Sequence, residues 1–196
     1  MVQPQSLILN LSRLFFQRSE AAAAHAMSLG VTKIETTMDS DEIVADLVRT
    51  SAERVKVYLK VGYREDGKNM LGEGDYVSES INGSKIVSAA RENSNIRVVG
   101  VAHNIEEVKS RASWEGALRQ FDAMVSKGEL SSFGVASNGI SLDKAHPLSV
   151  SINDLLDSCK NLDHELACVM LPFNCLENRG LMEIPSERGF ETIGTR

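Results

Sequence analysis

The sequence has few cysteines, few aromatic residues and no long apolar run. Its three cysteines, at 159, 168 and 175, are an odd number without Cys-x-x-Cys spacing. We therefore expect buried, reduced thiols and a reducing compartment. The histidines and cysteines also lack metal-ligand spacing, so no metal site is expected. No apolar stretch approaches the roughly 20 residues that cross a bilayer, and we expect no membrane span.

The sequence also lacks a basic cluster, and its formal net charge is −6. Nucleic acids and anionic membrane surfaces both require a basic footprint, so neither is an expected partner. The segment 1–19 contains Arg13 and Arg18 but no acidic residue, and such a segment is similar to an organellar transit peptide. We expect a cytoplasmic protein. If the segment is a targeting signal, the alternative location is an organellar matrix (mitochondrion or plastid). If it is not, the segment is expected to form a first strand that runs into a helix.

The chain has no phosphate-binding glycine turn of the form G-x-G-x-x-G. A doubly wound sheet normally carries that turn after its first strand. Gly72, Gly74 and Gly83 are too far apart to form one, and none stands between a predicted strand and a predicted helix. A (β/α) barrel of parallel strands therefore fits better than a dinucleotide-binding sheet.

Short apolar runs alternate with longer segments of helical period along the whole chain, which indicates βαβ units and a parallel sheet. The predicted strands are 31–35, 55–60, 96–103, 131–138, 166–174 and 190–194, with 7–11 as a further candidate. The predicted helices are 19–29, one that starts at Asp39 with a capping-box-like Glu42, 79–92, 113–128, 152–162 and a short one near 185–188. We count six strands, or seven with the first, in one domain covering residues 1–196.

Five of these strands end on polar residues. These are Glu35, Lys60, His103, Ser137 with Asn138, and Asn174. The C-terminal ends of parallel barrel strands open on one face, where barrel enzymes carry their chemistry. We therefore predict that these residues, although far apart in the sequence, meet around one rim.

Several segments, taken in order, resemble the aldo-keto reductase family. They are 26–37, 58–62 (Tyr-Leu-Lys-Val-Gly), 101–104 (Val-Ala-His-Asn), 121–138 with its Phe-Gly-Val-Ala-Ser-Asn end, 171–177 and 187–194. Together they run through almost the whole chain in the family's order and spacing. The resemblance implies an NADP(H)-dependent carbonyl reductase fold, which is a barrel that binds its cofactor across the C-terminal face without a Rossmann motif.

The resemblance also implies roles for the residues at the strand ends. The family uses an Asp, Tyr, Lys and His set, in which the lysine and aspartate lower the pKa of the proton-donating tyrosine. Lys60 takes the lysine place, His103 the histidine place, and Glu35 stands where the aspartate belongs. Ser137 and Asn138 match the pair that hydrogen-bonds the nicotinamide carboxamide, although Ala136 breaks the usual spacing, and Asn174 lies near another such contact.

Two parts of the family pattern are missing. No tyrosine follows Glu35 at the expected distance, because residues 36–42 run straight into the next helix. Tyr63, three residues after Lys60, is the one alternative near the barrel mouth. The chain also stops at Arg196, before the eighth strand and the basic segment that grips the cofactor's 2′-phosphate in this family. The expected fold is thus a TIM-barrel-like (β/α)8 barrel that is incomplete, with its eighth strand missing.

These departures predict a degenerate family member. Losing a general acid costs roughly 10²- to 10⁴-fold in rate, and NADPH should bind weakly or not at all. We expect an accessory, regulatory or structural subunit whose open barrel edge is covered by a protein partner or a larger assembly. The alternative is an NADPH-dependent aldehyde or ketone oxidoreductase with an incomplete C-terminus, and a third is a fragment with no stable fold alone. The alternative to these catalytic roles is a structural one, in which Lys60 and Glu35 form a simple ion pair and His103 is a core histidine.

Overall fold

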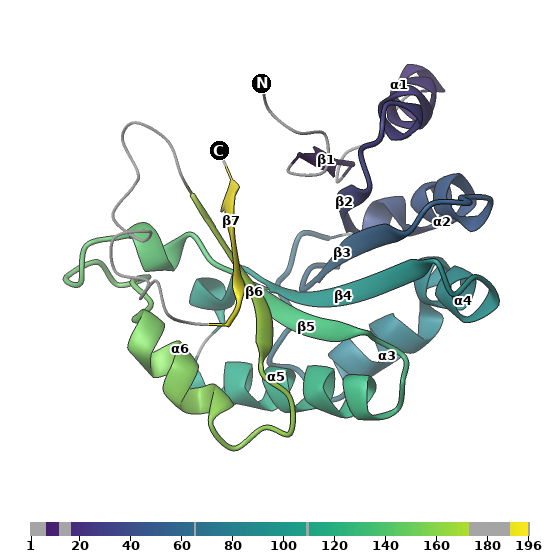
Figure 1. Cartoon of the computed structure of the whole chain (residues 1–196). Coiled ribbons are helices and arrows are strands. Elements are labelled where there is room, and N and C mark those ends of the chain that lie inside the picture. The colour runs from purple at the N-terminus through teal and green to yellow at the C-terminus, as the bar shows by residue number, and fades with distance from the viewer. Residues whose placement is uncertain (1–6, 12–16, 65, 109, 173–188, 196) are drawn as a thin grey trace.

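Seven strands form one parallel sheet in a computed structural model that describes residues 7–11, 17–64, 66–108, 110–172 and 189–195. The strands pair strictly in chain order from β1 to β7, and every pair is parallel. They are β1 (Ile8–Asn10), β2 (Lys33–Thr37), β3 (Val55–Val61), β4 (Ile96–His103), β5 (Ser132–Ala136), β6 (Leu166–Pro172) and β7 (Glu191–Thr195). The sheet curls into a partial barrel with helices between the strands (Figure 1), which confirms the predicted incomplete TIM-like barrel.

The helices alternate with the strands and cover the outer face of the sheet (Figure 1). They are α1 (Gln17–Ser28), α2 (Asp41–Arg49), α3 (Tyr76–Gly83), α4 (Lys85–Glu92), α5 (Arg111–Ser126) and α6 (Ile152–Cys159). Within the described residues, β2, β4 and β5 are each followed by a short 3-10 helix: η2 (Met38–Ser40), η3 (Ile105–Glu107) and η4 (Gly139–Ser141). None of the helices in the described part of the chain is long and apolar enough to cross a membrane.

The predicted helix 79–92 is two helices. Ser84 separates α3 from α4 with an extended backbone, and its hydroxyl accepts a hydrogen bond from the Val87 N–H. Serine favours such an N-cap position because its side chain satisfies an amide that has no partner within the helix. The helical spacing of apolar residues runs through 79–92 without a break, so it does not indicate that α4 starts within this segment.

The capping box expected at Asp39 and Glu42 is also not formed. Residues Met38–Ser40 make a 3-10 turn, and α2 begins only at Asp41. The Asp41 carboxylate is buried and accepts hydrogen bonds from the Ser84 hydroxyl at 2.6 Å and from the Lys85 and Ile86 N–H groups. It thus caps α4, a helix that is distant in sequence.

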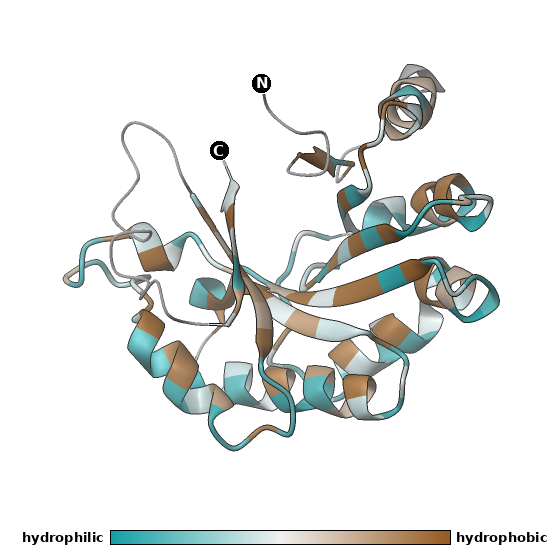
Figure 2. Cartoon of the chain, viewed as in Figure 1, coloured by the Kyte–Doolittle hydropathy of each residue, from teal (hydrophilic) through white to brown (hydrophobic). Residues whose placement is uncertain are grey.

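Side chains from alternate positions of the strands form two apolar clusters. The larger one packs the outer face of the sheet against the helices, which present their apolar sides to it (Figure 2). The smaller one lies inside the barrel and consists of Tyr58, Val99, Val101, Ala136, Cys168, Met170 and Ile193. Cys168 is buried as expected, and that burial raises the pKa of its thiol to about 12.

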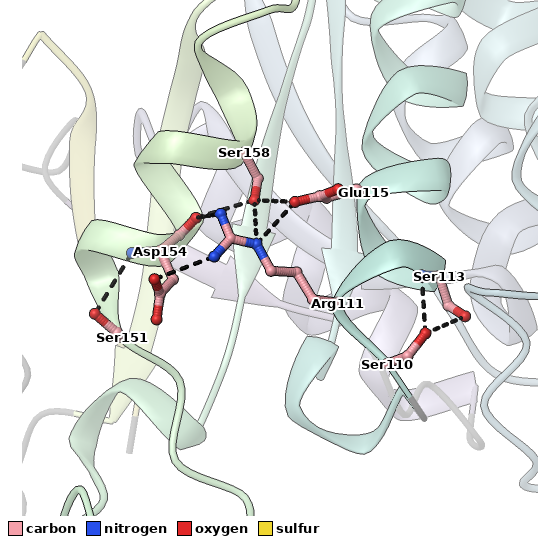
Figure 3. Close-up of polar contacts among 7 residues, drawn as sticks. All are labelled: Ser110, Arg111, Ser113, Glu115, Ser151, Asp154 and Ser158. Atoms are coloured by element: carbon pink, nitrogen blue, oxygen red, sulfur yellow. Dashed lines mark hydrogen bonds and ion pairs between the residues drawn. The ribbon is translucent and has the colours of Figure 1, made fainter.

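Neighbouring helices α5 and α6 are joined by a polar cluster around Arg111 (Figure 3). The Arg111 guanidinium donates to Glu115 Oε1 at 2.8 Å and to Asp154 Oδ1 and Ser158 Oγ, each at 3.2 Å. The Arg111 and Asp154 side chains are about half exposed, so their ion pair adds little net stability. The cluster joins the first turns of α5 to both ends of α6.

Most predicted elements exist, but several ends differ. β2 starts and ends two residues later than 31–35, and β5 ends at Ala136, so that Ser137 and Asn138 follow the strand. The predicted strand end at Asn174, Cys175 and the short helix near 185–188 lie outside the described residues.

Candidate functional site

The C-terminal ends of the strands open onto a cavity of about 1540 Å³. Its lining includes every predicted site residue that the structure describes: Glu35, Lys60, His103, Ser137 and Asn138. Asn174 lies outside the described residues. The predicted convergence around one rim is therefore present, while the chemical roles of these residues stay predictions. The same cavity extends between the two edge strands, because β1 and β7 both contribute to its wall.

Lys60 and Glu35 form an ion pair between the neighbouring strands β3 and β2. Their side chains are only 10% and 6% exposed. The Asn10 amide, on β1, donates a further hydrogen bond to Glu35 Oε1 at 3.2 Å. Removing two charges from water is costly unless they pair well and their remaining hydrogen-bonding atoms are satisfied. The pair is thus firmly held, and it faces the cavity.

His103 ends β4 and presents its imidazole to the same cavity. Burial, together with the nearby positive charge of Lys60, lowers the pKa of His103 to about 3. The imidazole is therefore neutral at physiological pH. No hydrogen bond from another described residue reaches the ring, so both its donor and its acceptor nitrogen are available to a ligand.

Tyr63 also lines the cavity, although no tyrosine stands at the expected place. Its ring packs edge-on against His103, with 5.1 Å between the ring centroids. Its hydroxyl donates to Glu107 Oε2 at 2.6 Å and accepts from Asn104 Nδ2 at 2.7 Å. In the described part of the chain, no hydrogen bond joins this hydroxyl to Lys60. Burial and the Glu107 hydrogen bond raise the pKa of Tyr63 above its ordinary value.

The backbone around Asn104 holds the loop after β3 against the rim. Asn104 has φ 54°, a left-handed conformation that non-glycine residues seldom adopt. Its N–H donates to the Ala136 carbonyl, and Asn69 Nδ2 donates to the Asn104 carbonyl at 3.2 Å. At Gly62 a Cβ would lie 2.9 Å from the His103 carbonyl oxygen, so only glycine allows this close approach.

Ser137 and Asn138 already have a partner inside the protein. The Ser137 hydroxyl donates to Glu106 Oε2 at 2.8 Å and accepts from the Gly139 N–H at 3.1 Å. The Asn138 N–H donates to Glu106 Oε1 at 3.0 Å. Ser137 is only 2% exposed. One carboxylate therefore engages the Ser137 side chain and the Asn138 backbone, while the Asn138 side-chain amide faces Asn104 Oδ1 at 3.5 Å.

Three further residues shape this rim and were not predicted from the sequence: Asn104, Glu106 and Glu107. The available signal was their position, because they follow the C-terminal end of β4 directly. In a barrel, the residues just after a strand lie on the same face as the strand end. Asn104, Glu106 and Glu107 could therefore have been selected as rim residues by the criterion that selected His103, namely a polar side chain at the C-terminal end of a strand.

No protein-family model matches the chain, and no curated protein matches it. Its fold is nevertheless similar to that of solved aldo-keto reductases. An aldo/keto reductase from Brucella melitensis superposes with a TM-score of 0.57 and 13% identity, over 85% of this chain and 57% of that one. A thermostable aldo-keto reductase, solved with the inhibitor epalrestat, superposes with a TM-score of 0.65 and 12% identity, over 98% of this chain and 68% of that one. The chain thus spans little more than half of the Brucella protein, and at these identities the likeness concerns the fold.

Proposed function

We propose that this chain is an aldo-keto-reductase-like barrel with impaired catalysis that acts as an accessory, regulatory or structural subunit. One observation carries the proposal. The Lys60–Glu35 pair faces the cavity, but the hydroxyl of Tyr63 in the same cavity is hydrogen-bonded to Glu107 and not to Lys60. A phenol with an ordinary pKa of about 10 becomes a useful acid–base catalyst near neutral pH only when a cation stabilises its anion. The Tyr63 hydroxyl instead donates to a carboxylate, which has the opposite effect on its pKa.

The cofactor contacts support the same proposal. NADPH is the cofactor that the fold likeness suggests, and Ser137 with Asn138 would have to hold its carboxamide. The Ser137 hydroxyl and the Asn138 backbone N–H already donate to Glu106, and the Asn138 side-chain amide lies 3.5 Å from Asn104 Oδ1. A carboxamide would have to displace a carboxylate that accepts two charge-assisted hydrogen bonds, which are among the stronger ones in proteins. As they stand, these residues do not fit the nicotinamide group, and we propose weak or absent NADPH binding.

The direct test is a titration with NADPH into the millimolar range, followed by cofactor fluorescence and thermal shift, together with an assay of aldehyde reduction. We expect weak or no binding, and turnover no higher than that of the Lys60→Met variant. Turnover clearly above that variant would contradict the proposal. A cooperative melt of the chain without cofactor is expected as well, because a fragment without a stable fold would melt broadly.

A working NADPH-dependent aldehyde or ketone reductase is the second candidate. The observation that favours it is the arrangement of Tyr63 and the neutral His103 in the cavity that also holds Lys60. If Tyr63 supplies the proton, Tyr63→Phe should lower the rate by roughly 10²- to 10⁴-fold. If the chain is not an enzyme, the wild type and Tyr63→Phe should show the same negligible rate.

We further propose that a protein partner or larger assembly covers the open side of the barrel. This is supported by the two edge strands, β1 and β7, which both line the cavity, and by Leu7 beside β1, which is 49% exposed. Edges with unpaired N–H and C=O groups readily pair with other chains. Size-exclusion chromatography of an extract from the native source should show the protein in a larger complex, and elution as a monomer there would contradict this.

A further inference from the structure

Three basic side chains stand side by side at the N-terminal ends of the strands, opposite the end that carries Lys60. Lys33 pairs in register with Lys56, and Lys56 pairs in register with Arg97. Register partners in a parallel sheet point to the same face. Tyr58 and Val99, two residues further along β3 and β4, belong to the cluster inside the barrel, so this row also faces the interior. We call Lys33, Lys56 and Arg97 the floor row.

A single carboxylate reaches the floor row from the far side of the barrel. Glu191, the first residue of β7, accepts from Lys33 Nζ at 2.6 Å and from Lys56 Nζ at 2.9 Å. The Tyr58 hydroxyl donates to the same carboxylate at 2.7 Å. Burial opposes the ionisation of Glu191, but these three hydrogen bonds outweigh it and lower the pKa of Glu191 to about 2. Glu191 is therefore a fully ionised and well-partnered group.

One carboxylate does not balance three cations. Within the described residues, no ion pair or hydrogen bond reaches the Arg97 guanidinium, which is exposed. Like charges directly opposite each other on neighbouring strands are destabilising. The surplus is unusual in a chain whose formal net charge is −6. The lysine side chains stay 26% and 33% exposed, and each ammonium has three donors, of which Glu191 takes one.

We propose that the floor row binds a phosphate group, either as inorganic phosphate or as part of a small phosphate monoester. The guanidinium fork of Arg97 matches two phosphate oxygens, while Lys33 and Lys56 contribute charge and single donors. The phosphate lies on the solvent side of Glu191 and leaves the Glu191 contacts in place. This proposal does not rest on the proposed function, because the floor row and Lys60 are at opposite ends of the strands.

The test is isothermal titration calorimetry with sodium phosphate and with glycerol 3-phosphate, at constant ionic strength set by sodium chloride. The variants are Arg97→Ala and, as a matched control, Arg119→Ala, which removes an exposed arginine on the outer helix α5. We expect Arg97→Ala to weaken binding at least about tenfold, as the loss of a charge-assisted contact implies, and Arg119→Ala to bind like the wild type. Equal binding by all three proteins, or no binding, would overturn the proposal.

Backbone-amide NMR during the same titration shows where the phosphate sits. Shifts at Lys33, Lys56 and Arg97 support the floor row. Shifts confined to Gly62, His103 and Asn138 would place the anion at the cavity instead and overturn the proposal. Tighter binding of glycerol 3-phosphate than of inorganic phosphate would assign the site to phosphate monoesters, and equal affinities would assign it to the free ion.

Discussion

At the scale of single residues, the polar groups of the rim are distinguished by the partners that they have within the protein. Lys60, His103 and Tyr63 all line one cavity. The Tyr63 hydroxyl donates to Glu107, and the Ser137 hydroxyl and the Asn138 backbone N–H donate to Glu106. Two adjacent carboxylates after β4 thus account for both proposed losses, of acid–base function and of cofactor binding.

The first prediction concerns Glu106. Replacing it with alanine frees the Ser137 hydroxyl and the Asn138 N–H, so NADPH should bind more tightly than to the wild type. The same change should lower the free energy of unfolding by about 1–3 kcal/mol, because a buried hydroxyl loses its partner. Cofactor titration and urea denaturation measure the two effects. Glu107→Ala is the matched control and should leave NADPH binding unchanged; if both variants bind NADPH as poorly as the wild type, Glu106 is not what limits binding.

The second prediction concerns the charge of His103. Its pKa of about 3 lies below the ordinary value of 6.5, so the unfolded chain binds a proton between these pH values that the folded chain does not bind. Burial of His103 therefore makes the fold less stable as the pH falls below about 6.5. An NMR titration of the imidazole should show neutral His103 down to at least pH 5. A midpoint near 6.5 would contradict this account.

At the scale of elements, the start of α4 is stabilised by a residue from another helix. Asp41, at the first position of α2, caps α4, and Ser84 completes the same junction. The negative charge at the α4 N-terminus also complements the helix dipole. This contact couples the packing of α2 and α4 over the outer face of the sheet.

The third prediction follows from that junction. Asp41→Ala should lower the free energy of unfolding by about 2–3 kcal/mol, since the amides of α4 lose a buried, charged acceptor. The control is Asp39→Ala, at the exposed residue that the sequence pattern had suggested as the cap, with an expected change within about 0.5 kcal/mol. Urea denaturation of both variants measures the difference. Equal losses for the two would show that Asp41 does not act as the cap.

At the scale of the whole molecule, β7 is held on two sides. It pairs with β6 along one edge, and Glu191 reaches across the barrel to β2 and β3. In the described part of the chain, β7 and β1 do not pair with each other. The Glu191 contacts therefore take over part of the closure that strand pairing supplies in a complete barrel.

The fourth prediction is a pH dependence carried by Glu191. Its pKa is about 2 in the folded chain against an ordinary value of 4.5, so the unfolded chain holds the proton more tightly. The stabilising contribution is complete above pH 4.5 and is lost as the pH falls towards about 2. Urea denaturation at pH 6 and pH 3 should show a smaller acid-induced loss for Glu191→Gln than for the wild type. Glu79→Gln, at an exposed position of α3, should behave like the wild type.

The order of the elements and the face that carries the candidate site could both be predicted from the sequence. Alternating strand and helix periods led to the parallel sheet, and polar residues at the strand ends led to Glu35, Lys60, His103, Ser137 and Asn138. These are local signals, because side-chain period and strand direction depend on neighbouring residues. The helical period alone did not separate α3 from α4; the local signal was the N-cap Ser84, while the Asp41 carboxylate that also caps α4 lies more than 40 positions away in the chain.

The partner of each polar group, in contrast, depends on how the strands and loops are arranged in space. Tyr63 lies beside His103 because the loop after β3 is held against the rim, and Glu191 meets Lys33 and Lys56 because the sheet curls. Those contacts join residues as many as 158 positions apart. Hydrogen bonds and ion pairs form only over distances of a few ångströms. The curl of the sheet brings these residues within such distances, and no local sequence pattern links them.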